Sequence, residues 1–276
     1  MAPGFLAVFS EPGNQVSLDK FHDWYDNEHI PLRLNHLPSF LSGARYQTID
    51  GIKPSWIAVY EIDDTKTFSD QSYTVLREKR SQREKDVIGR LEVLDRRTCE
   101  VVREVGEASG RTTGLRVGNP SRWVVTHEVG GGKGAEFEQV LKWLNGVVTK
   151  LENNSVGWVK TRVLKVLESA KTRANLGENG LEEEQDVPLS HFVFHGLSLS
   201  TLYELWTRIN FFLFFFWSLE FISEESLNSS TFREIIEKNN ESECLRFSEF
   251  RRWELYKSYP CVAQGNVNFE ALKLKA

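Results

Sequence analysis

One order of secondary-structure elements is predicted twice along the chain, and this repetition limits the possible folds more than any other feature of the sequence. Short apolar runs bounded by turn residues indicate strands, and capped segments with helical periodicity indicate helices. In the first half the order is strand, helix, strand, strand, helix, strand, at residues 5–10, 18–30, 40–49, 55–61, 65–84 and 90–104. The second half repeats that order at residues 122–129, 135–151, 156–168, 189–197, 231–238 and 244–256. The chain is therefore predicted to hold two copies of one α+β unit.

A β-α-β-β-α-β order is that of the ferredoxin-like unit, whose helices cover only one face of the sheet. The strand Trp56–Tyr60 is apolar at every position, so both of its faces are expected to be buried. Two units packed sheet to sheet would bury the second face. The predicted fold is thus α+β, with tandem ferredoxin-like repeats packed sheet to sheet within one chain. We place the first repeat at residues 1–106, a linker at 107–119, the second repeat at 120–260 and a C-terminal tail at 261–276.

The composition argues against several classes of protein. Hydrophobic residues make up 40% of the 276 residues and charged residues 26%, which is typical of a globular protein and not of a disordered chain. The net charge of −5 argues against a nucleic-acid partner, which needs a basic face. The cysteines Cys99, Cys244 and Cys261 show no C-x-x-C spacing and indicate a reducing compartment, so a cytoplasmic location is expected. The apolar run Phe5–Phe9 is too short for a signal peptide.

An apolar segment, Ile209–Trp217, interrupts the second unit. A membrane-spanning helix needs roughly 20 apolar residues, so no stable membrane span is expected. We predict an insertion near residues 205–222 that lies outside both repeat sheets and is buried or covered by a partner, which allows self-association. A second interpretation is that this low-complexity run of Phe is translated intron.

The segment Phe21–Pro31, with the sequence FHDWYDNEHIP, resembles the first helix of the dimeric α/β-barrel superfamily. It is most similar to fungal EthD-like proteins, in which an aromatic-rich helix ends in Glu-His-x-Pro. Residues 43–46, 56–61, 157–158 and 250–256 fit the same pattern, and the resemblance is strongest over residues 4–105. The helix predicted at 135–151 lacks Glu-His-x-Pro, so one active site is expected. The resemblance implies a barrel-shaped pocket between two sheets, usually without metal or cofactor. Members of the superfamily include cyclases, decarboxylases and monooxygenases that act on aromatic polyketide-like molecules.

The candidate catalytic residues lie on that first helix. Phe21, Tyr25 and His29 follow one another at intervals of four residues and so share a helix face. A neutral imidazole near pH 7 accepts or donates a proton, so His29 is the candidate acid/base. Asp26 or Glu28 would orient His29, and Tyr25 would donate a hydrogen bond to a substrate carbonyl that becomes an enolate. The alternative is that His29 only caps the helix end.

The candidate substrate-binding residues are two aromatic side chains and two arginines. Phe21 and Trp24 are expected in the core or in the pocket wall. Arg33 and Arg45 are candidates for binding a carboxylate or phenolate, with surface ion pairs as the alternative. No cofactor and no metal are expected. A metal site formed by His22, Asp26 and His29 is a less favoured alternative, since this ligand spacing is common by chance.

These observations together predict a cofactor-independent proton-transfer enzyme of the cyclase, decarboxylase or monooxygenase type. Its partner would be a small hydrophobic, aromatic or polyketide-derived molecule. The alternatives are a non-catalytic binding or assembly module on the same barrel, or an inactive paralogue. A pocket with His29 beside polar groups would favour the enzyme, and a packed, dry barrel would favour assembly.

Overall fold

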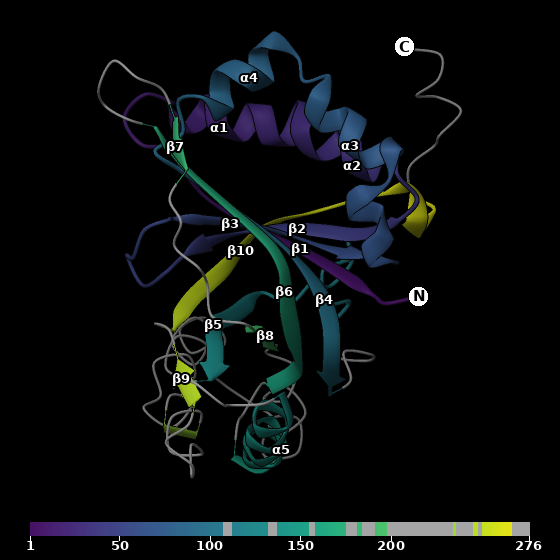
Figure 1. Cartoon of the computed structure of the whole chain (residues 1–276), viewed down its shortest axis with the longest axis vertical. Helices are drawn as coiled ribbons and strands as arrows, with labels where there is room; N and C mark the ends of the chain where they lie inside the picture. The colour runs from purple at the N-terminus through teal and green to yellow at the C-terminus, as the bar shows by residue number, and fades with distance from the viewer. Residues whose placement is uncertain are drawn as a thin grey trace, which may run out of the picture.

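Eight strands of the computed structural model form one closed antiparallel barrel, with helices outside it (Figure 1). The structure describes residues 1–106, 112–131, 137–154, 158–174, 181–183, 191–197, 234–235, 245–247 and 250–266. The strands are β1 (Gly4–Glu11), β2 (Phe40–Thr48), β3 (Trp56–Ile62), β4 (Val93–Val105), β5 (Trp123–Gly131), β6 (Trp158–Ala174), β7 (Leu181–Glu183), β8 (His191–Leu197), β9 (Leu245–Phe247) and β10 (Arg251–Tyr259). The helices are α1 (Leu18–Trp24), the π-helix η1 (Tyr25–His29), α2 (Ile30–Leu34), the 3₁₀-helix η2 (Thr65–Ser69), α3 (Gln71–Glu78), α4 (Gln82–Ile88), α5 (Phe137–Asn154) and the 3₁₀-helix η3 (Val262–Gln264).

The barrel closes because each half of the chain pairs with the other at both of its edges. The strand order is β2-β3-β1-β4-β6-β8-β5-β10, and β10 pairs with β2 to complete the circle. The short strands β7 and β9 pair with β6 and β5 outside this path. Closure leaves none of the eight strands with an unpaired edge. The predicted α+β class is confirmed, and the two sheets are joined edge to edge in a barrel consistent with the predicted dimeric α/β-barrel arrangement.

The two halves share an order of strands. In the first half it is β2-β3-β1-β4, and in the second it is β6-β8-β5-β10, so each half runs second, third, first, fourth. Of the helix predicted at 231–238, only residues 234–235 are described, and they are helical. The predicted apolar insertion at 205–222 lies outside the described residues. No described helix is long and apolar enough to cross a membrane.

Three apolar cores follow from the alternation of side chains along the strands. On β1, Phe5, Ala7 and Phe9 point into the barrel, whereas Leu6 and Val8 point outward beneath α1–α4. A third core lies between α5 and the strands of the second half. In Figure 1, α1–α4 and α5 lie on opposite sides of the strands. The prediction that Trp56–Tyr60 is buried on both faces is confirmed, because all five residues are at most 4% exposed.

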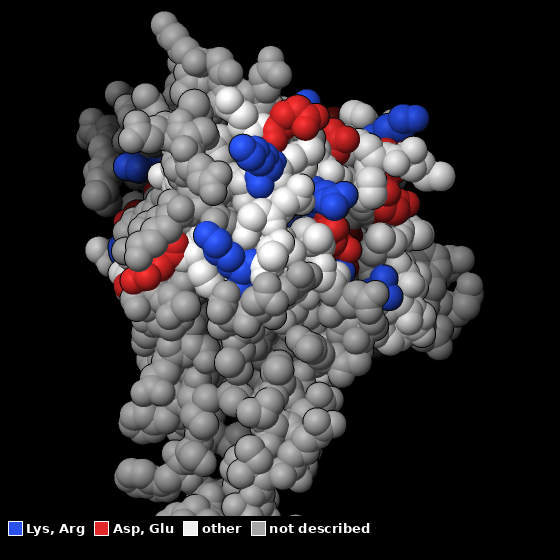
Figure 2. All heavy atoms as spheres, turned by 90° about the horizontal axis from the view of Figure 1, so that it is seen from below, with Lys and Arg blue, Asp and Glu red and all other residues white. Residues whose placement is uncertain are grey.

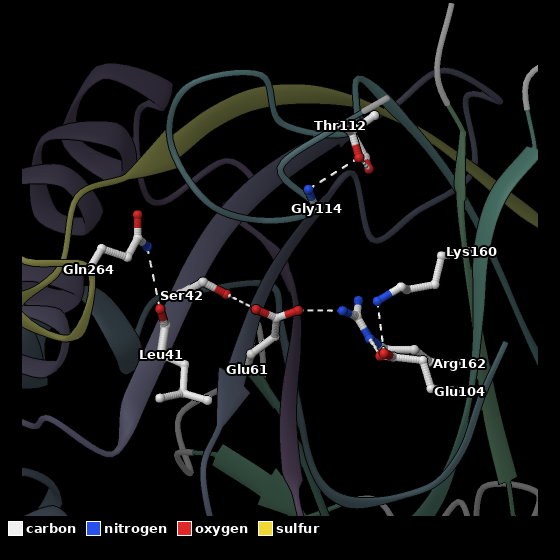
Figure 3. A network of polar contacts seen from close by, with 10 residues as sticks. Leu41, Ser42, Glu61, Glu104, Thr112, Gly114, Lys160, Arg162 and Gln264 are labelled. Atoms are coloured by element: carbon white, nitrogen blue, oxygen red, sulfur yellow. Dashed lines mark hydrogen bonds and ion pairs between the residues drawn. The ribbon is translucent and has the colours of Figure 1, made fainter. Parts of the chain in front are cut away.

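The described part of the predicted linker, residues 112–119, lies at one mouth of the barrel. Leu115, which is 1% exposed, packs into the barrel interior, and the Tyr46 hydroxyl donates to the Ser121 carbonyl at 3.0 Å. Below this loop, Glu61 accepts hydrogen bonds from Ser42 and Arg162, and Arg162 also donates to Glu104 (Figure 3). This mouth is therefore filled by protein side chains.

Replacing Leu115 with alanine is expected to destabilise the protein by about 2–5 kcal/mol, because it removes apolar contacts and leaves a void in the barrel. Urea unfolding measures this change. The neighbouring Arg116, which is exposed, gives the matched control Arg116→Ala, expected to change stability by less than about 0.5 kcal/mol. Equal stability of the two variants would show that the loop is not a plug.

The helical segments differ from the prediction in two places. The first helix was expected to end near Ile30, but it continues through Pro31 to Leu34. The reason is η1: the Ile30 N–H bonds to the Tyr25 carbonyl five residues back, and Pro31 falls in the first turn of α2, where no N–H is needed. The predicted helix 65–84 is divided into η2, α3 and α4, because Asp70 and Ser81 cap new helix starts.

The described surface carries charges of both signs. Figure 2 shows Lys and Arg side chains mixed with Asp and Glu over the described part of the face seen from below. The mixed charges on this face are unlike a continuous basic patch for a nucleic-acid backbone. Cys99 and Cys261 are buried, free thiols.

Candidate functional site

The predicted catalytic residues lie in the π-helical turn η1, a type of irregularity that is frequent at functional sites. One side of this helix packs against β1 and β3. Phe21 and Trp24 are 0% exposed and Tyr25 is 1% exposed, and all three belong to the core beneath the helices. The His29 side chain is 12% exposed, so it lies at the border of this core.

A buried carboxylate holds the His29 imidazole. The distance between His29 Nδ1 and Glu84 Oε1 is 2.7 Å, and the Glu84 side chain is 1% exposed. Burial and the Arg33 guanidinium lower the pKa of His29 to about 4, although Glu84 acts in the opposite direction. Burial opposes ionisation of Glu84, but the bond from His29 and the charges of Arg33 and Arg80 outweigh it and lower the pKa of Glu84. At pH 7 a neutral imidazole therefore donates Nδ1–H to an ionised Glu84, which leaves the lone pair on Nε2.

The carboxylates expected to orient His29 lie elsewhere. Asp26 accepts hydrogen bonds from Lys257 at 2.8 Å and from the Tyr259 hydroxyl at 2.5 Å. Glu28 bonds to the Ser81 hydroxyl and lies 3.7 Å from Arg83. In place of both, the structure brings Glu84 of α4 to His29.

The sequence around Glu84 contains a recognisable local pattern, but that pattern predicts a helix cap and not a contact with His29. Ser81 and Glu84 have the S-x-x-E spacing of a capping box, and Ser81 does cap α4. In a capping box the Glu side chain turns back to the cap residue, whereas Glu84 reaches His29, 55 positions earlier in the chain. No local pattern predicts that contact.

On the helix side of the sheet, four buried polar atoms have no hydrogen-bond partner among the described residues: Trp24 Nε1, Tyr60 Oη, Arg80 Nε and Glu84 Oε2. The Trp24 ring lies 4.7 Å from the His29 ring, and Arg80 Nε lies 4.0 Å from Glu84 Oε1. Buried polar groups are normally paired, so these atoms could bond to a polar molecule enclosed between the helices and the sheet.

Arg45 and Arg33, expected to bind substrate, have protein partners. The Arg45 side chain is 1% exposed and donates to Asp26 at 3.3 Å and to His22 Nδ1 at 3.1 Å. Its guanidinium carbon lies 4.2–5.3 Å from the centres of four rings, those of Tyr25, Phe21, Tyr256 and Trp56. Arg33, which is 4% exposed, donates to the His29 carbonyl at 2.6 Å.

The alternative metal site is not assembled. His22 faces Arg45 and stacks on Tyr256 at 4.5 Å, Asp26 bonds to Lys257 and Tyr259, and His29 bonds to Glu84. Among the residues that the structure describes, no group of three His, Cys, Asp or Glu side chains is placed to hold a metal ion.

Alternation along β8 puts His191, Val193 and His195 on one face of the strand. Val193 lies in the core beneath α5, and His195 Nε2 lies 3.2 Å from His127 Nε2 in the same region. This face therefore points to α5, neither into the barrel nor to solvent.

The structure is similar to several solved proteins at low identity. An anthrone oxidase-like protein aligns with a TM-score of 0.49 and 10% identity, covering 94% of this chain and 92% of that chain. A monooxygenase-like protein from Lactobacillus acidophilus aligns with a TM-score of 0.46 and 7% identity, covering 94% of this chain and 97% of that chain. A chlorite dismutase-like protein aligns with a TM-score of 0.47 and 9% identity, covering 92% of this chain and 95% of that chain. No protein-family model and no curated protein sequence matches the chain. At these TM-scores and identities the similarity identifies neither a family nor a reaction.

Proposed function

We propose that the protein is a cofactor-independent enzyme that moves a proton on a small aromatic or polyketide-derived molecule, with His29 as the acid/base. The observation that carries this proposal is the His29–Glu84 pair. Glu84 accepts a hydrogen bond from His29 Nδ1–H, so the lone pair of the neutral imidazole is on Nε2. A general base needs this arrangement of a fixed tautomer and an available lone pair.

The proposed step is removal of a proton from a carbon next to a carbonyl group. His29 Nε2 takes the proton, the C–H electron pair forms the enolate, and Glu84 stabilises the resulting imidazolium. A pKa of about 4 makes His29 a weak base, which restricts the substrate to acidic C–H groups such as those between a carbonyl and an aromatic ring. Trp24 Nε1, Tyr60 Oη and Arg80 Nε are buried donors without a described partner, and we propose that at least one of them bonds to the enolate oxygen.

The other predicted residues have supporting roles in this proposal. Phe21 and Trp24 form an apolar wall, and Arg33 fixes the backbone of His29. Tyr25 donates to the substrate carbonyl, while Asp26 and Glu28 position the helix through Lys257, Tyr259 and Arg83. Arg45 supports the ring of Tyr25, 4.2 Å away.

We also propose that the two halves are tandem ferredoxin-like repeats, at residues 1–106 and 120–260. The shared strand order supports this proposal. Only the first half carries Glu-His-x-Pro, so one site per chain is proposed. The cytoplasmic location remains a prediction.

Hydrogen–deuterium exchange in D₂O tests the proposed removal of a proton directly. The reaction that follows this step need not be known. Phenyl-substituted β-diketones and fused-ring ketones serve as probes, and ¹H NMR follows loss of the acidic C–H signal. The protein is expected to accelerate exchange, and His29→Ala to reduce the rate by about 10²–10⁴. As long as the protein stays folded, the rate should also fall as the pH drops toward 4, where His29 becomes protonated.

Two further variants complete the experiment. His36→Ala, which replaces an exposed histidine of the same region, is expected to keep the full rate. Glu84→Gln should give a smaller loss than His29→Ala and a changed pH profile, because Glu84 acts through the imidazole. A wild-type rate in His29→Ala would remove His29 from the mechanism.

The second candidate is a non-catalytic assembly module on the same barrel. Phe21, Trp24 and Tyr25 are closely packed in the core beneath the helices, at 0–1% exposure, and this packing favours assembly over catalysis. The same measurement separates the two, since a non-catalytic module would accelerate exchange of no probe.

A further inference from the structure

Three arginines from different parts of the helical layer lie beside the His29–Glu84 pair. Arg33 belongs to α2, Arg77 to α3, and Arg80 to the turn between α3 and α4. Arg33 donates to the His29 carbonyl at 2.6 Å, and Arg80 Nε lies 4.0 Å from Glu84 Oε1. We call Arg33, Arg77 and Arg80 the arginine cluster. Sequence analysis did not connect them, because these helices converge only in the folded chain.

The carboxylates near the arginine cluster do not balance its charge. Among the described residues, Glu84 is the only carboxylate within 4.0 Å of any of the three guanidinium groups. Arg33 uses a backbone carbonyl as its partner, and Arg77 has no carboxylate at ion-pair distance in the described part of the chain. Because His29 is neutral at pH 7, three positive charges face one negative charge.

The pKa of Arg80 reflects this imbalance. Burial and the positive charges of Arg77 and Arg33 lower the pKa of Arg80, and the opposite effect of Glu84 does not compensate for them. Glu28 of η1 is already bonded to Ser81 and lies 3.7 Å from Arg83. An anion that binds beside Arg80 would therefore meet positive charge that the protein leaves uncompensated.

The surroundings of Arg80 connect the protein surface with the buried core. The Arg80 side chain is 29% exposed, whereas its Nε atom is buried and has no described hydrogen-bond partner. The His29 side chain next to this place is 12% exposed. Deeper in the core, Trp24 is 0% exposed, its ring lies 4.7 Å from the His29 ring, and its Nε1 atom also has no described partner. A ligand would thus meet a cation near the surface and an aromatic ring farther in.

The chemistry of the cluster favours a carboxylate over other anions of similar charge. A planar guanidinium group donates two parallel hydrogen bonds to a planar carboxylate, and this geometry gives the strongest ion pairs in proteins. Glu84 Oε2 is a buried acceptor without a described partner, so it would repel an anion that lies in the core. The carboxylate of a ligand is therefore expected on the solvent side, at Arg80, with the rest of the ligand toward Trp24.

We infer that the site beside His29 recognises an aromatic carboxylate, with the carboxylate bound by Arg80 and the aromatic ring directed toward Trp24. The charges of Arg33 and Arg77 add to the attraction. As an assignment of the substrate, the inference rests on the proposed function. The substrate is then an aromatic keto acid of the arylpyruvate class, whose acidic C–H lies between the ring and the ketone.

Two ligands of the same shape and different charge test the recognition of a carboxylate. The probes are 3-phenylpropanoate and 3-phenylpropanamide, with binding to the wild-type protein measured by calorimetry and NMR titration at pH 7. The propanoate is expected to bind at least tenfold more tightly than the amide. Equal or tighter binding of the amide, or no saturable binding of the propanoate, would overturn the inference.

The variant Arg80→Gln locates the site, because it removes the charge and keeps a polar side chain. It is expected to weaken binding of 3-phenylpropanoate about tenfold or more and to leave the amide nearly unchanged. Arg90→Gln, at an arginine that is 38% exposed and paired with Asp86, is the matched control and should bind like wild type. Unchanged affinity in Arg80→Gln contradicts the inference. If that variant does not fold, the ¹H–¹⁵N signals of Arg80 Nε and Trp24 Nε1 in the wild-type protein decide, since the propanoate must shift both.

Hydrogen exchange separates this inference from the proposed function. Phenylpyruvate and 1-phenylpropan-2-one both carry a benzylic C–H next to a ketone, but only phenylpyruvate has a carboxylate. Relative to the rates without protein, exchange of phenylpyruvate is expected to be accelerated at least tenfold more. Binding of 3-phenylpropanoate that depends on Arg80, without exchange of any probe, would confirm the carboxylate site and contradict the proposed function. Equal acceleration of both ketones, without binding that depends on Arg80, would contradict the inference alone.

Discussion

Replacing Arg45 with alanine is expected to lower the free energy of unfolding by about 3–5 kcal/mol, the range found when one partner of a buried ion pair is removed. The Arg45 side chain is 1% exposed and its charge is compensated by Asp26. Its removal would leave an empty space between four aromatic rings, which lie 4.2–5.3 Å from the guanidinium carbon. Arg45→Lys should restore part of the stability only, because an ammonium group cannot stack as a planar guanidinium does.

Urea unfolding at pH 7 measures this effect. The control is Arg122→Ala, since Arg122 also combines an ion pair, with Glu254, and an aromatic contact, with Trp123. Its side chain is 54% exposed, so a loss of less than about 1 kcal/mol is expected. A similarly small loss in Arg45→Ala would show that the rings pack without the arginine.

The strands were predictable because their signal is local. Alternation and apolar runs placed β1 and β3 within one or two residues of their observed ends, and the continuous apolar run of β3 correctly indicated burial on both faces. The α+β class followed from the order of such elements. Pairing of β4 with β6 and of β10 with β2 joins distant parts of the chain, and no local pattern specifies it.

The candidate site was predictable only in part, for the same reason. The helix phase put Tyr25 and His29 near each other, and their ring centres lie 5.2 Å apart. The partner of His29 comes from α4, and two of the partners of Asp26, Lys257 and Tyr259, come from β10, more than 200 positions later. Similarly, residues 107–119 were predicted to form a linker, and no local pattern indicated that Leu115 packs into the barrel.

Two buried histidines, His127 and His195, take part in a chain of hydrogen bonds beneath α5. No local sequence pattern connects them. The Trp158 indole N–H donates to Thr161 Oγ1 at 3.0 Å, and Thr161 Oγ1 lies 2.7 Å from His195 Nδ1. His195 Nε2 lies 3.2 Å from His127 Nε2, and His127 Nδ1 lies 3.3 Å from the Glu128 carbonyl. All these bonds can form together with both imidazoles neutral. The Thr161 hydroxyl donates to His195 Nδ1, and His195 Nε2–H donates to His127 Nε2. His127 Nδ1–H then donates to the Glu128 carbonyl. Protonation of both rings would place two N–H donors opposite each other, and a proton added to either ring would be a charge buried in this core.

Acid is therefore expected to unfold the protein at a pH well above that at which carboxylates alone would be protonated. Burial lowers the pKa of His127 to about 4, and burial together with His127 lowers the pKa of His195 well below 6.5. The unfolded chain takes up these protons near pH 6.5, so the stabilisation is complete above pH 6.5 and is lost as the pH falls toward 4. For His127 this loss amounts to about 3 kcal/mol, and His29 with its pKa of about 4 adds a similar loss.

The variant His127→Gln/His195→Gln removes the titration of this pair. Its free energy of unfolding at pH 7 should be below that of wild type, because the hydrogen-bond chain is disturbed. Between pH 6.5 and pH 4.5 its stability should fall less steeply, by about 1.4 kcal/mol per pH unit for each histidine removed. Urea unfolding at half-unit pH steps gives both slopes, and His36→Gln, at an exposed position, should keep the wild-type slope. Parallel curves for the wild type and the double variant would show that the pair is protonated in the folded protein, because only a difference in proton uptake between the folded and unfolded states produces a slope.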